Sequence, residues 1–195
     1  MQFDLITPRK YVIYTGNIGI VNNSMWLIDA ARILEKKGRT DIKILVIGDG
    51  PMKKEMIKIT KDEKLGTIVF KDLSPKNEIV PFVQHAIASL VPLKSTPILD
   101  TSSPNKLFES IAAGVPVIQN TNGWIKDFLN ENRLGFTIDP SDAESLVEKI
   151  IELDAMPSTF FEVFARHSKA IAEREFDKKQ LSARMLSSIE KLIDK

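Results

Sequence analysis

The sequence predicts an α/β protein with a doubly wound parallel sheet of about six strands and with helices at the C-terminal end of the chain. Three observations support this prediction. Short apolar runs alternate with amphipathic segments of helical spacing along most of the 195 residues. Runs such as Lys43–Ile47 (KILVI) are continuously apolar, which is typical of strands covered on both faces. Successive βα units favour a parallel sheet with right-handed crossovers.

Strands are expected where short apolar runs stand between turn residues. In chain order these runs are Tyr11–Tyr14, Lys43–Ile47, Thr67–Phe70, Ala88–Val91, Val117–Gln119 and Phe136–Ile138. Helices are expected between them, where apolar residues recur at helical spacing. These segments are Asn23–Lys37, Met52–Lys64, Asn77–His85, Ile125–Asn130 and Ala143–Leu153.

The segment TSSPNKLFESIAAGVPVIQN, which begins at Thr101, predicts one more helix followed by a strand. Ser103 is expected as its N-cap with Pro104 at the first helical position, and Gly114 as its left-handed stop. The apolar face consists of Leu107, Phe108, Ile111 and Ala112.

Lys106 is unusual in this helix, because a cation in the first turn opposes the helix dipole at a cost of about 0.3–1 kcal/mol. Either an anion outside the helix compensates this lysine, or an ion pair with Glu109 does. In an open α/β sheet, ligands bind beyond the carboxyl ends of the strands, where this helix begins. Free N–H groups and a lysine at a helix start predict an anion site there.

Two helices with no strand between them, Ser158–Arg174 and Asp177–Ile193, are expected to end the chain. The first carries an apolar stripe that would pack on the sheet domain or, in part, on another domain. The stripe consists of Phe160, Phe161, Phe164 and Ile171. We therefore divide the chain into a linker or incoming connection (1–10), a sheet domain (11–157) and C-terminal helices (158–195).

The composition excludes several classes of function. A net charge of +1 gives no support for a nucleic-acid partner, and none is expected. The chain has no cysteine for disulfides or thiolate metal sites, which is compatible with a reducing, cytoplasmic location. The first residues lack the apolar core of a signal peptide, and the longest mostly apolar run, Ile79–Leu93, is too short to span a bilayer.

Other motifs carry little information on their own. Gly48 and Gly50 begin a dinucleotide fingerprint, but its third glycine would fall at Lys53, and no GxxxxGK[ST] loop is present. His85 and His167 are isolated, so no catalytic residue can be named, and no Asp-x-Asp pair is available to hold a metal ion. Pattern and spacing indicate an α/β domain with a phosphate-bearing ligand.

The order of several sequence blocks resembles a known family. Along the chain these blocks read YTGN, LVIGDGP, VFKDL, LVPL, SPNKLFESIAAGVPVI and LGFTIDPSD. Together they resemble the C-terminal half of bacterial retaining family-4 glycosyltransferases, in the capsule and exopolysaccharide branch, over about Tyr11–Glu190. The resemblance implies a GT-B fold, in which two Rossmann-like domains face each other, and this chain would be the half that binds the nucleotide-sugar.

The resemblance also implies a reaction and partners. The enzyme would transfer a sugar, with a UDP-sugar as the expected donor, in synthesis of a cell-surface polysaccharide such as capsule, exopolysaccharide or O-antigen. The missing N-terminal domain would bind the acceptor, so this chain alone would be inactive. No cofactor or metal ion is implied, since donors already in place would stabilise the leaving diphosphate. The full-length protein would be cytoplasmic, with room for peripheral association at the inner face of the membrane.

The resemblance assigns donor-binding roles to individual residues. Glu109 would accept the ribose hydroxyls, and Lys106 would hold the diphosphate together with nearby polar groups. Lys71 to Leu73 would hold the base through their backbone. The full donor-binding set is Gly16, Asn17, Gly48, Gly50, Lys71, Leu73, Ser103, Asn105, Lys106, Leu107 and Glu109.

Two departures from the family pattern matter. Thr101 stands where a first glutamate would fall, and Asn17 and Asn22–Asn23 stand near the usual basic pair, which places more of the phosphate neutralisation on Lys106. One alternative is a non-catalytic nucleotide-binding module or half-protein that pairs with a separate acceptor-binding chain. A receiver-like signalling domain is disfavoured, because no acidic cluster follows the first strand.

Overall fold

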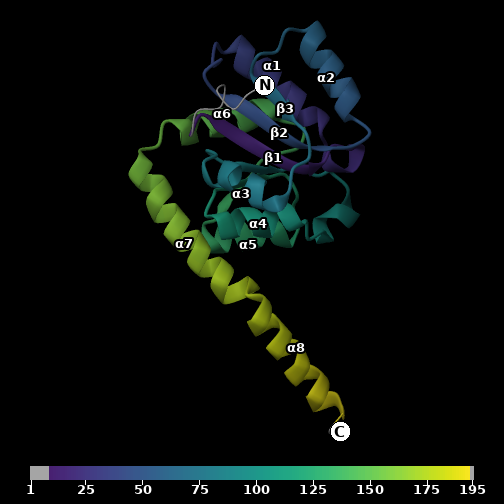
Figure 1. Ribbon diagram of the computed structural model, residues 1–195, viewed down its shortest axis with the longest axis vertical. Coiled ribbons are helices and arrows are strands. Elements are labelled where there is room, and N and C mark those ends of the chain that lie inside the picture. Colours follow the sequence, from purple (N-terminus) through teal and green to yellow (C-terminus); the bar gives the residue numbers. More distant parts are fainter. Residues whose placement is uncertain (1–8, 194–195) are drawn as a thin grey trace.

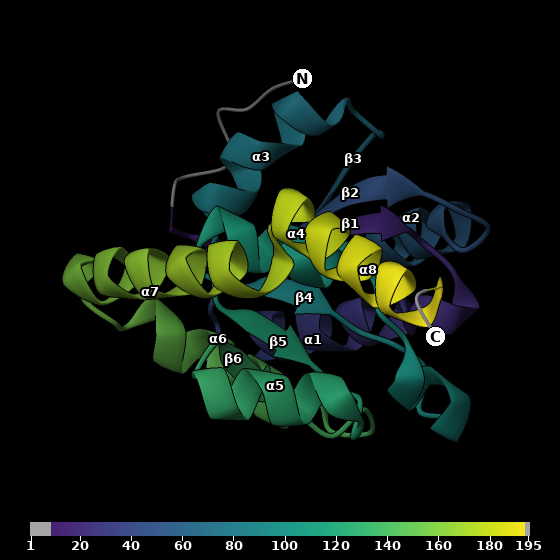
Figure 2. The same ribbon diagram turned by 90° about the horizontal axis from the view of Figure 1, so that it is seen from below.

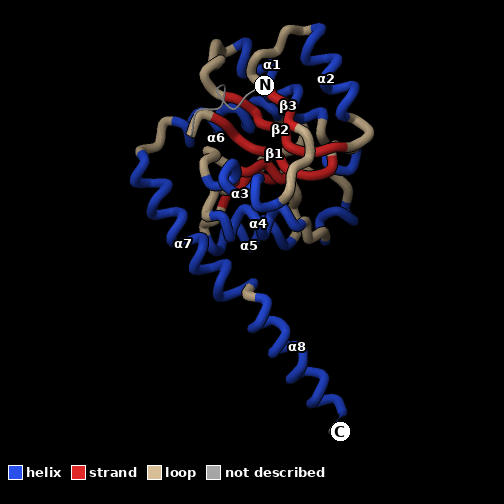
Figure 3. The backbone as a smooth tube through the Cα atoms, in the orientation of Figure 1, coloured by secondary structure: helices blue, strands red, loops and turns tan. Residues whose placement is uncertain are grey.

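The computed structural model describes residues 9–193 and confirms the predicted α/β fold with six parallel strands. The strands pair in the order β3-β2-β1-β4-β5-β6 and lie at the centre of the domain (Figure 3). Their bounds are β1 (Tyr11–Asn17), β2 (Lys43–Asp49), β3 (Ile68–Lys71), β4 (Ser89–Val91), β5 (Val117–Gln119) and β6 (Gly135–Thr137). The strand order reverses between β1 and β4, and ligand crevices open at such a point.

Helices cover both faces of this sheet (Figure 1). Their bounds are α1 (Met25–Lys36), α2 (Lys53–Asp62), α3 (Lys76–Gln84), α4 (Asn105–Ala113), α5 (Trp124–Asn132), α6 (Ala143–Asp154), α7 (Ser158–Phe176) and α8 (Lys178–Ile193). Side chains of β1 alternate between the two faces, because successive strand residues point in opposite directions. Val12 and Tyr14 join the core that includes α1, α2 and α6, whereas Tyr11 and Ile13 join the core under α3.

Two local features of the fold differ from the predictions. The strand β1 extends to Asn17 and β2 to Asp49, because these residues pair with each other across the sheet. The predicted Ser103 cap is wrong: α4 begins at Asn105, Pro104 occupies the N-cap position, and no side chain caps the helix. The physical reason is an extended backbone before the helix, with ψ of 132° at Pro104.

The helix α7 packs on the sheet domain, as the first interpretation of its apolar stripe predicted. Phe161 and Ile171 are buried, and the Ser168 hydroxyl donates to the Ile111 carbonyl oxygen of α4 at 2.7 Å. Figure 2 shows α7 beside α4. Gly114 ends α4 with the predicted positive φ, +79°, and its missing side chain permits this contact, since a Cβ there would lie 2.9 Å from Ala165 Cα.

The helix α8, in contrast, has no buried residue and extends away from the domain (Figure 1). Its exposed large apolar side chains are Leu181, Met185, Leu186, Ile189, Leu192 and Ile193. The apolar surface without a partner therefore lies on α8 rather than on the stripe of α7. The predicted linker falls mostly outside the described residues, which begin at residue 9.

A carboxylate at the end of α6 connects two distant parts of the domain. Asp154 accepts hydrogen bonds from Lys10 Nζ at 2.9 Å and from Arg39 Nη2 at 2.6 Å, and its side chain is 8% exposed. We expect Asp154→Ala to lower the free energy of unfolding by about 1–2 kcal/mol, because both cations lose a half-buried partner. Urea unfolding measures this. The exposed Asp41 of the same cluster is the matched control, and Asp41→Ala is expected to cost less than about 1 kcal/mol; equal losses would contradict the prediction.

Candidate functional site

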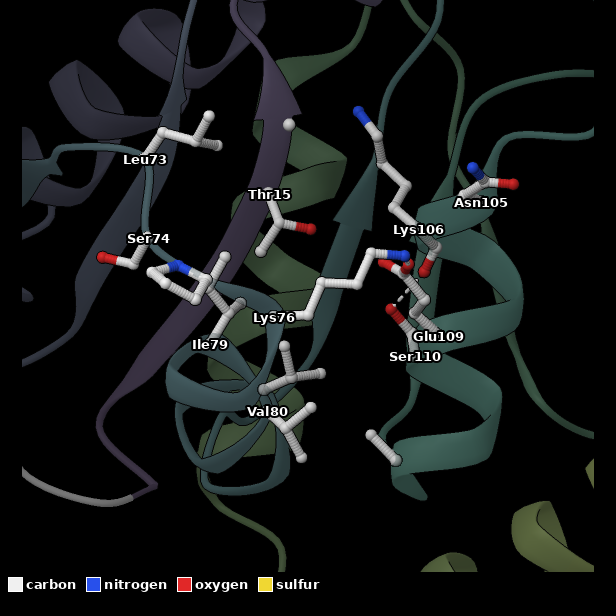
Figure 4. Close-up of a pocket in the computed structure, with 14 residues that line it drawn as sticks. Thr15, Leu73, Ser74, Lys76, Ile79, Val80, Asn105, Lys106, Glu109 and Ser110 are labelled. Carbon is white, nitrogen blue, oxygen red and sulfur yellow. Dashed lines mark hydrogen bonds and ion pairs between the residues drawn. The ribbon is translucent and has the colours of Figure 1, made fainter.

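A pocket of about 660 Å³ opens at the carboxyl end of the sheet, beside the reversal of strand order (Figure 4). It is formed by the end of β1, the loop after β3, and the facing sides of α3 and α4. Its polar lining includes Thr15, Lys76, Asn105, Lys106, Glu109 and Ser110. Its apolar lining includes Leu73, Pro75, Ile79, Val80, Val83 and Ala113. The pocket thus combines a charged mouth with an apolar floor, as many small-molecule sites do.

Lys106 reaches from the first turn of α4 to the end of β1. Its Nζ lies 4.0 Å from the centre of the Tyr14 ring and donates to Asn22 Oδ1 at 3.2 Å. A Cβ built on Gly16 would lie 3.8 Å from the same nitrogen, so the amine borders the turn that follows Thr15. Within residues 9–193, no carboxylate forms an ion pair with this lysine.

The environment of Lys106 disfavours its charge. Burial lowers the pKa of Lys106 to about 8, and the neighbouring Glu109 carboxylate acts more weakly in the opposite direction. A pKa near 8 leaves the amine mostly protonated at neutral pH, in a site where its charge is poorly compensated. A bound anion would supply that compensation and favour the protonated form.

Glu109 is paired with a different lysine. Lys76 Nζ, in the first turn of α3, donates to Glu109 Oε1 at 2.6 Å, and both side chains are exposed. Figure 4 shows Lys76 pointing across the pocket toward Glu109. The Lys106–Glu109 ion pair considered from the sequence is therefore not formed. Of the two explanations for a lysine at this helix start, the geometry favours an external anion.

The structure brings some of the predicted donor-binding residues together at the pocket and places others outside its lining. Gly16, Leu73, Asn105, Lys106 and Glu109 line the pocket. Asn17, Gly48, Gly50, Lys71, Ser103 and Leu107 do not.

The residues outside the lining have local roles of several kinds. The Leu107 side chain is fully buried in the core, and its N–H donates to the Pro104 carbonyl oxygen at 3.0 Å. Lys71 Nζ lies 4.5 Å from the centre of the Phe82 ring. Asn17 and Ser103 are exposed at the edge of the sheet and before α4.

Gly48 and Gly50 are required by packing within the chain. A Cβ on Gly48 would lie 1.9 Å from the Gly16 carbonyl oxygen, and a Cβ on Gly50 would lie 2.3 Å from the Ile18 carbonyl oxygen. Both distances are far below van der Waals contact. These glycines let β2 and its turn approach the turn after β1, and so they shape the site whether or not a ligand touches them.

Several residues at the site were not predicted from the sequence. Among them, Lys76 holds Glu109 and Tyr14 contacts the Lys106 amine. Asn22, which also contacts this amine, was named only as standing near the family's usual basic pair. Tyr14 stands in the apolar run YVIY, which starts with a tyrosine as well, so no local signal marks it. Lys76 directly precedes the predicted helix Asn77–His85, and only the structure places it in the first turn of α3, where it repeats the anomaly of Lys106.

No helix within residues 9–193 is long and apolar enough to cross a membrane. Over the same range, no three His, Cys, Asp or Glu side chains gather in a way that could hold a metal ion.

Curated relatives of the chain share its sequence weakly but over most of its length. Two of them are described as "Putative colanic acid biosynthesis glycosyltransferase WcaL", one from Escherichia coli K12 and one from Salmonella typhimurium LT2, each 19% identical to this chain. The match to the E. coli protein covers 85% of this chain and 41% of that protein. The chain therefore spans less than half the length of these relatives.

Solved structures share the fold. The C-terminal domain of a glycosyl transferase group 1 family protein (LpcC) from Francisella tularensis superposes with a TM-score of 0.69 at 20% identity, over 88% of each chain. A TarM mutant from S. aureus, in complex with fondaparinux, α-GlcNAc-glycerol and UDP, superposes with a TM-score of 0.74 at 15% identity, over 91% of this chain and 35% of that one. The family described as glycosyl transferases group 1 matches residues 9–155, and the chain belongs to this glycosyltransferase family.

Proposed function

We propose that this chain is the donor-binding domain of a glycosyltransferase that uses a UDP-sugar in the synthesis of a cell-surface polysaccharide. Membership of the family supports sugar transfer. The relatives named for colanic acid biosynthesis support a polysaccharide product. The TarM structure in complex with UDP, and a pneumococcal O-GlcNAc transferase GtfA structure in complex with UDP and GlcNAc, support the choice of UDP.

The observation that carries the proposal is the position of Lys106. A buried amine without an ion-pair partner among residues 9–193 lies at the start of a helix whose first turn has no side-chain cap. In the first turn of α4, the Leu107 N–H donates to the Pro104 carbonyl oxygen, which leaves the N–H groups of Asn105 and Lys106 without an acceptor inside the helix. Backbone donors and a cation at one point form a complementary site for a diphosphate.

The rest of the pocket accommodates the rest of a nucleotide in this proposal. The Glu109 carboxylate, at the pocket mouth, would accept hydrogen bonds from the ribose hydroxyls. The base would lie near Leu73 and the apolar floor formed by α3 and α4. No metal ion is required, because Lys106 and the N–H groups would balance the charge that develops on the leaving diphosphate.

A second domain would complete the enzyme in this proposal. The chain matches 41% of the length of the E. coli relative, so acceptor-binding groups would come from the remainder, whether it is fused or a separate chain. The apolar side chains along α8 are suited to pack on such a domain, because the described part of this chain leaves them uncovered. We accordingly expect this chain alone to bind donor without transferring sugar.

Calorimetry with a panel of nucleotides tests the proposed function. We expect UDP to bind the purified chain at least about tenfold more tightly than GDP or ADP, a difference of about 1.4 kcal/mol. Uridine should bind more weakly than UDP, since it lacks the diphosphate that Lys106 would contact. Equal affinity for uridine and UDP, or no binding of any nucleotide at millimolar concentration, would contradict the proposal.

A further inference from the structure

Tyr14 connects the two parts of the proposed anion site. It lies near the end of β1 and is completely buried. Its hydroxyl donates to the carbonyl oxygen of Asn17, the last residue of the strand. The face of its ring lies 4.0 Å from Lys106 Nζ, which comes from α4 on the neighbouring side of the strand reversal. One side chain thus touches both the end of β1 and the lysine of α4.

Few other groups hold the Lys106 amine in place. Within residues 9–193, its Nζ contacts the Tyr14 ring and Asn22 Oδ1. The charged groups around it are Glu109, one turn further along α4, and Lys76 of α3, which is ion-paired with Glu109. An aromatic ring face attracts a cation, and the attraction grows when the cation is removed from water. The ring therefore offsets part of the cost of burying the ammonium.

The hydroxyl of Tyr14 has a separate effect. Burial raises the pKa of this phenol above its usual range, so the hydroxyl keeps its proton and donates at every pH at which the protein is handled. Its bond to the Asn17 carbonyl oxygen ties the buried side chain to the end of β1. This end of the strand includes Gly16, whose positive φ of +113° is a conformation that other residues rarely adopt.

We propose that Tyr14 is the positioning residue of this anion site: its ring face supports the Lys106 ammonium, and its hydroxyl fixes the end of β1 beside it. The role rests on the proposed function, because it concerns how the diphosphate-binding lysine is held ready. Tyr14 itself touches no ligand in this proposal. The ring and the hydroxyl would thus contribute separately to the anion site, and different substitutions at position 14 can distinguish the two contributions.

The ring is tested by changing its charge distribution while keeping its shape. Tyr14→Phe is the reference, and it is compared with 4-fluoro- and 3,4,5-trifluorophenylalanine incorporated at position 14. The pKa of Lys106 is measured in each protein by NMR of the ¹³C-dimethylated lysines, with Lys106→Arg used for assignment. Because fluorine weakens the attraction of the ring face for a cation, we expect this pKa to fall stepwise, by about half a pH unit in total. An unchanged pKa across the series would overturn the role of the ring.

The same proteins then report on binding. Affinity for UDP is measured from pH 6 to 10, and we expect it to fall once Lys106 loses its proton. The pH at which it falls should move down along the fluorinated series together with the NMR pKa. Tyr14→Phe should keep the pH midpoint of the native protein but bind UDP about three- to tenfold more weakly, because the end of β1 loses its hydrogen bond to the hydroxyl. Native affinity in Tyr14→Phe would overturn the role of the hydroxyl.

These measurements separate the two proposals. The pKa series needs no ligand, so it decides the contact between the ring and the amine even in a protein that binds no nucleotide. Failure of native protein to bind UDP at any pH would overturn the proposed function. If UDP binds but the pH midpoint of binding is the same in all the fluorinated proteins, only the positioning role of Tyr14 is overturned. A thermal melt of each variant identifies losses of affinity that come from unfolding.

Discussion

Replacing Lys106 by methionine should weaken UDP binding by about 1–3 kcal/mol and, in the same protein, stabilise the ligand-free fold. The loss of affinity is the usual scale for removing one charge-assisted contact to a phosphate. The gain in stability follows from the site itself, because the ammonium is buried without an ion-pair partner among residues 9–193 and methionine fills similar space without charge. Calorimetry with UDP and urea unfolding of the free protein measure the two effects.

The gain in stability has a defined dependence on pH. The pKa of Lys106 is about 8 in the folded chain and about 10.5 in the unfolded chain, so folding opposes protonation of this amine. The cost is complete below pH 8, where both states carry the proton, and it declines as the pH rises from 8 toward 10.5. The advantage of Lys106→Met over the native protein should therefore be up to about 3 kcal/mol at pH 7 and should shrink through this range.

A neighbouring lysine provides the control for the loss of charge. Lys94 is exposed, follows β4 at the same edge of the sheet, and does not line the large pocket. We expect Lys94→Met to change UDP affinity by less than about 0.5 kcal/mol, the usual range for a surface substitution away from special features. A Lys106→Met protein that is less stable than native and binds UDP equally well would reduce Lys106 to a structural residue.

The parts of the fold that could be predicted are those with a local signal. KILVI is apolar at every interior position, so its strand required no knowledge of the remainder of the chain. Gly114 was predicted as a helix stop because it stands between a helical pattern and a Val-Pro step, where helices commonly end on a glycine with positive φ. Lys106 attracted attention because its charge opposes its own helix, and an anomaly of this kind can be recognised from neighbouring residues alone.

The parts that could not be predicted depend on contacts between distant segments. The start of α4 differs from the prediction because the chain before it is extended, and Trp124 Nε1 holds the Ser102 carbonyl oxygen at 2.9 Å from 22 residues away. Lys76 reaches Glu109 across 33 residues of sequence. Helix spacing favoured Lys106 as the partner of Glu109, and only the approach of α3 to α4 provides the competitor.

Glu109→Ala should weaken UDP binding by about 1–3 kcal/mol and should also remove the preference for ribose over deoxyribose. A carboxylate that accepts hydrogen bonds from both ribose hydroxyls loses one of them when the ligand is 2′-deoxy-UDP. We therefore expect native protein to bind UDP about fivefold or more better than 2′-deoxy-UDP, and Glu109→Ala to bind the two nearly alike. Parallel titrations with both nucleotides measure this preference. A general loss of pocket structure would weaken the binding of both nucleotides and would not selectively remove the preference for UDP.

The ion pair with Lys76 makes Glu109 the most ambiguous residue of the site, and it also supplies the decisive control. If Glu109 served only to join α3 to α4, Lys76→Met would break the same pair and reproduce the effect of Glu109→Ala. Because both side chains are exposed, the pair itself is worth no more than about 1 kcal/mol. If the carboxylate instead binds ribose, Lys76→Met should keep the preference for UDP over 2′-deoxy-UDP. The Glu109 carboxylate remains as the hydrogen-bond acceptor, and the Lys76 amine no longer competes with the ribose for it. Loss of that preference in both variants would assign Glu109 to the packing of two helices, and Lys106 alone would then support the assignment of a nucleotide to this pocket.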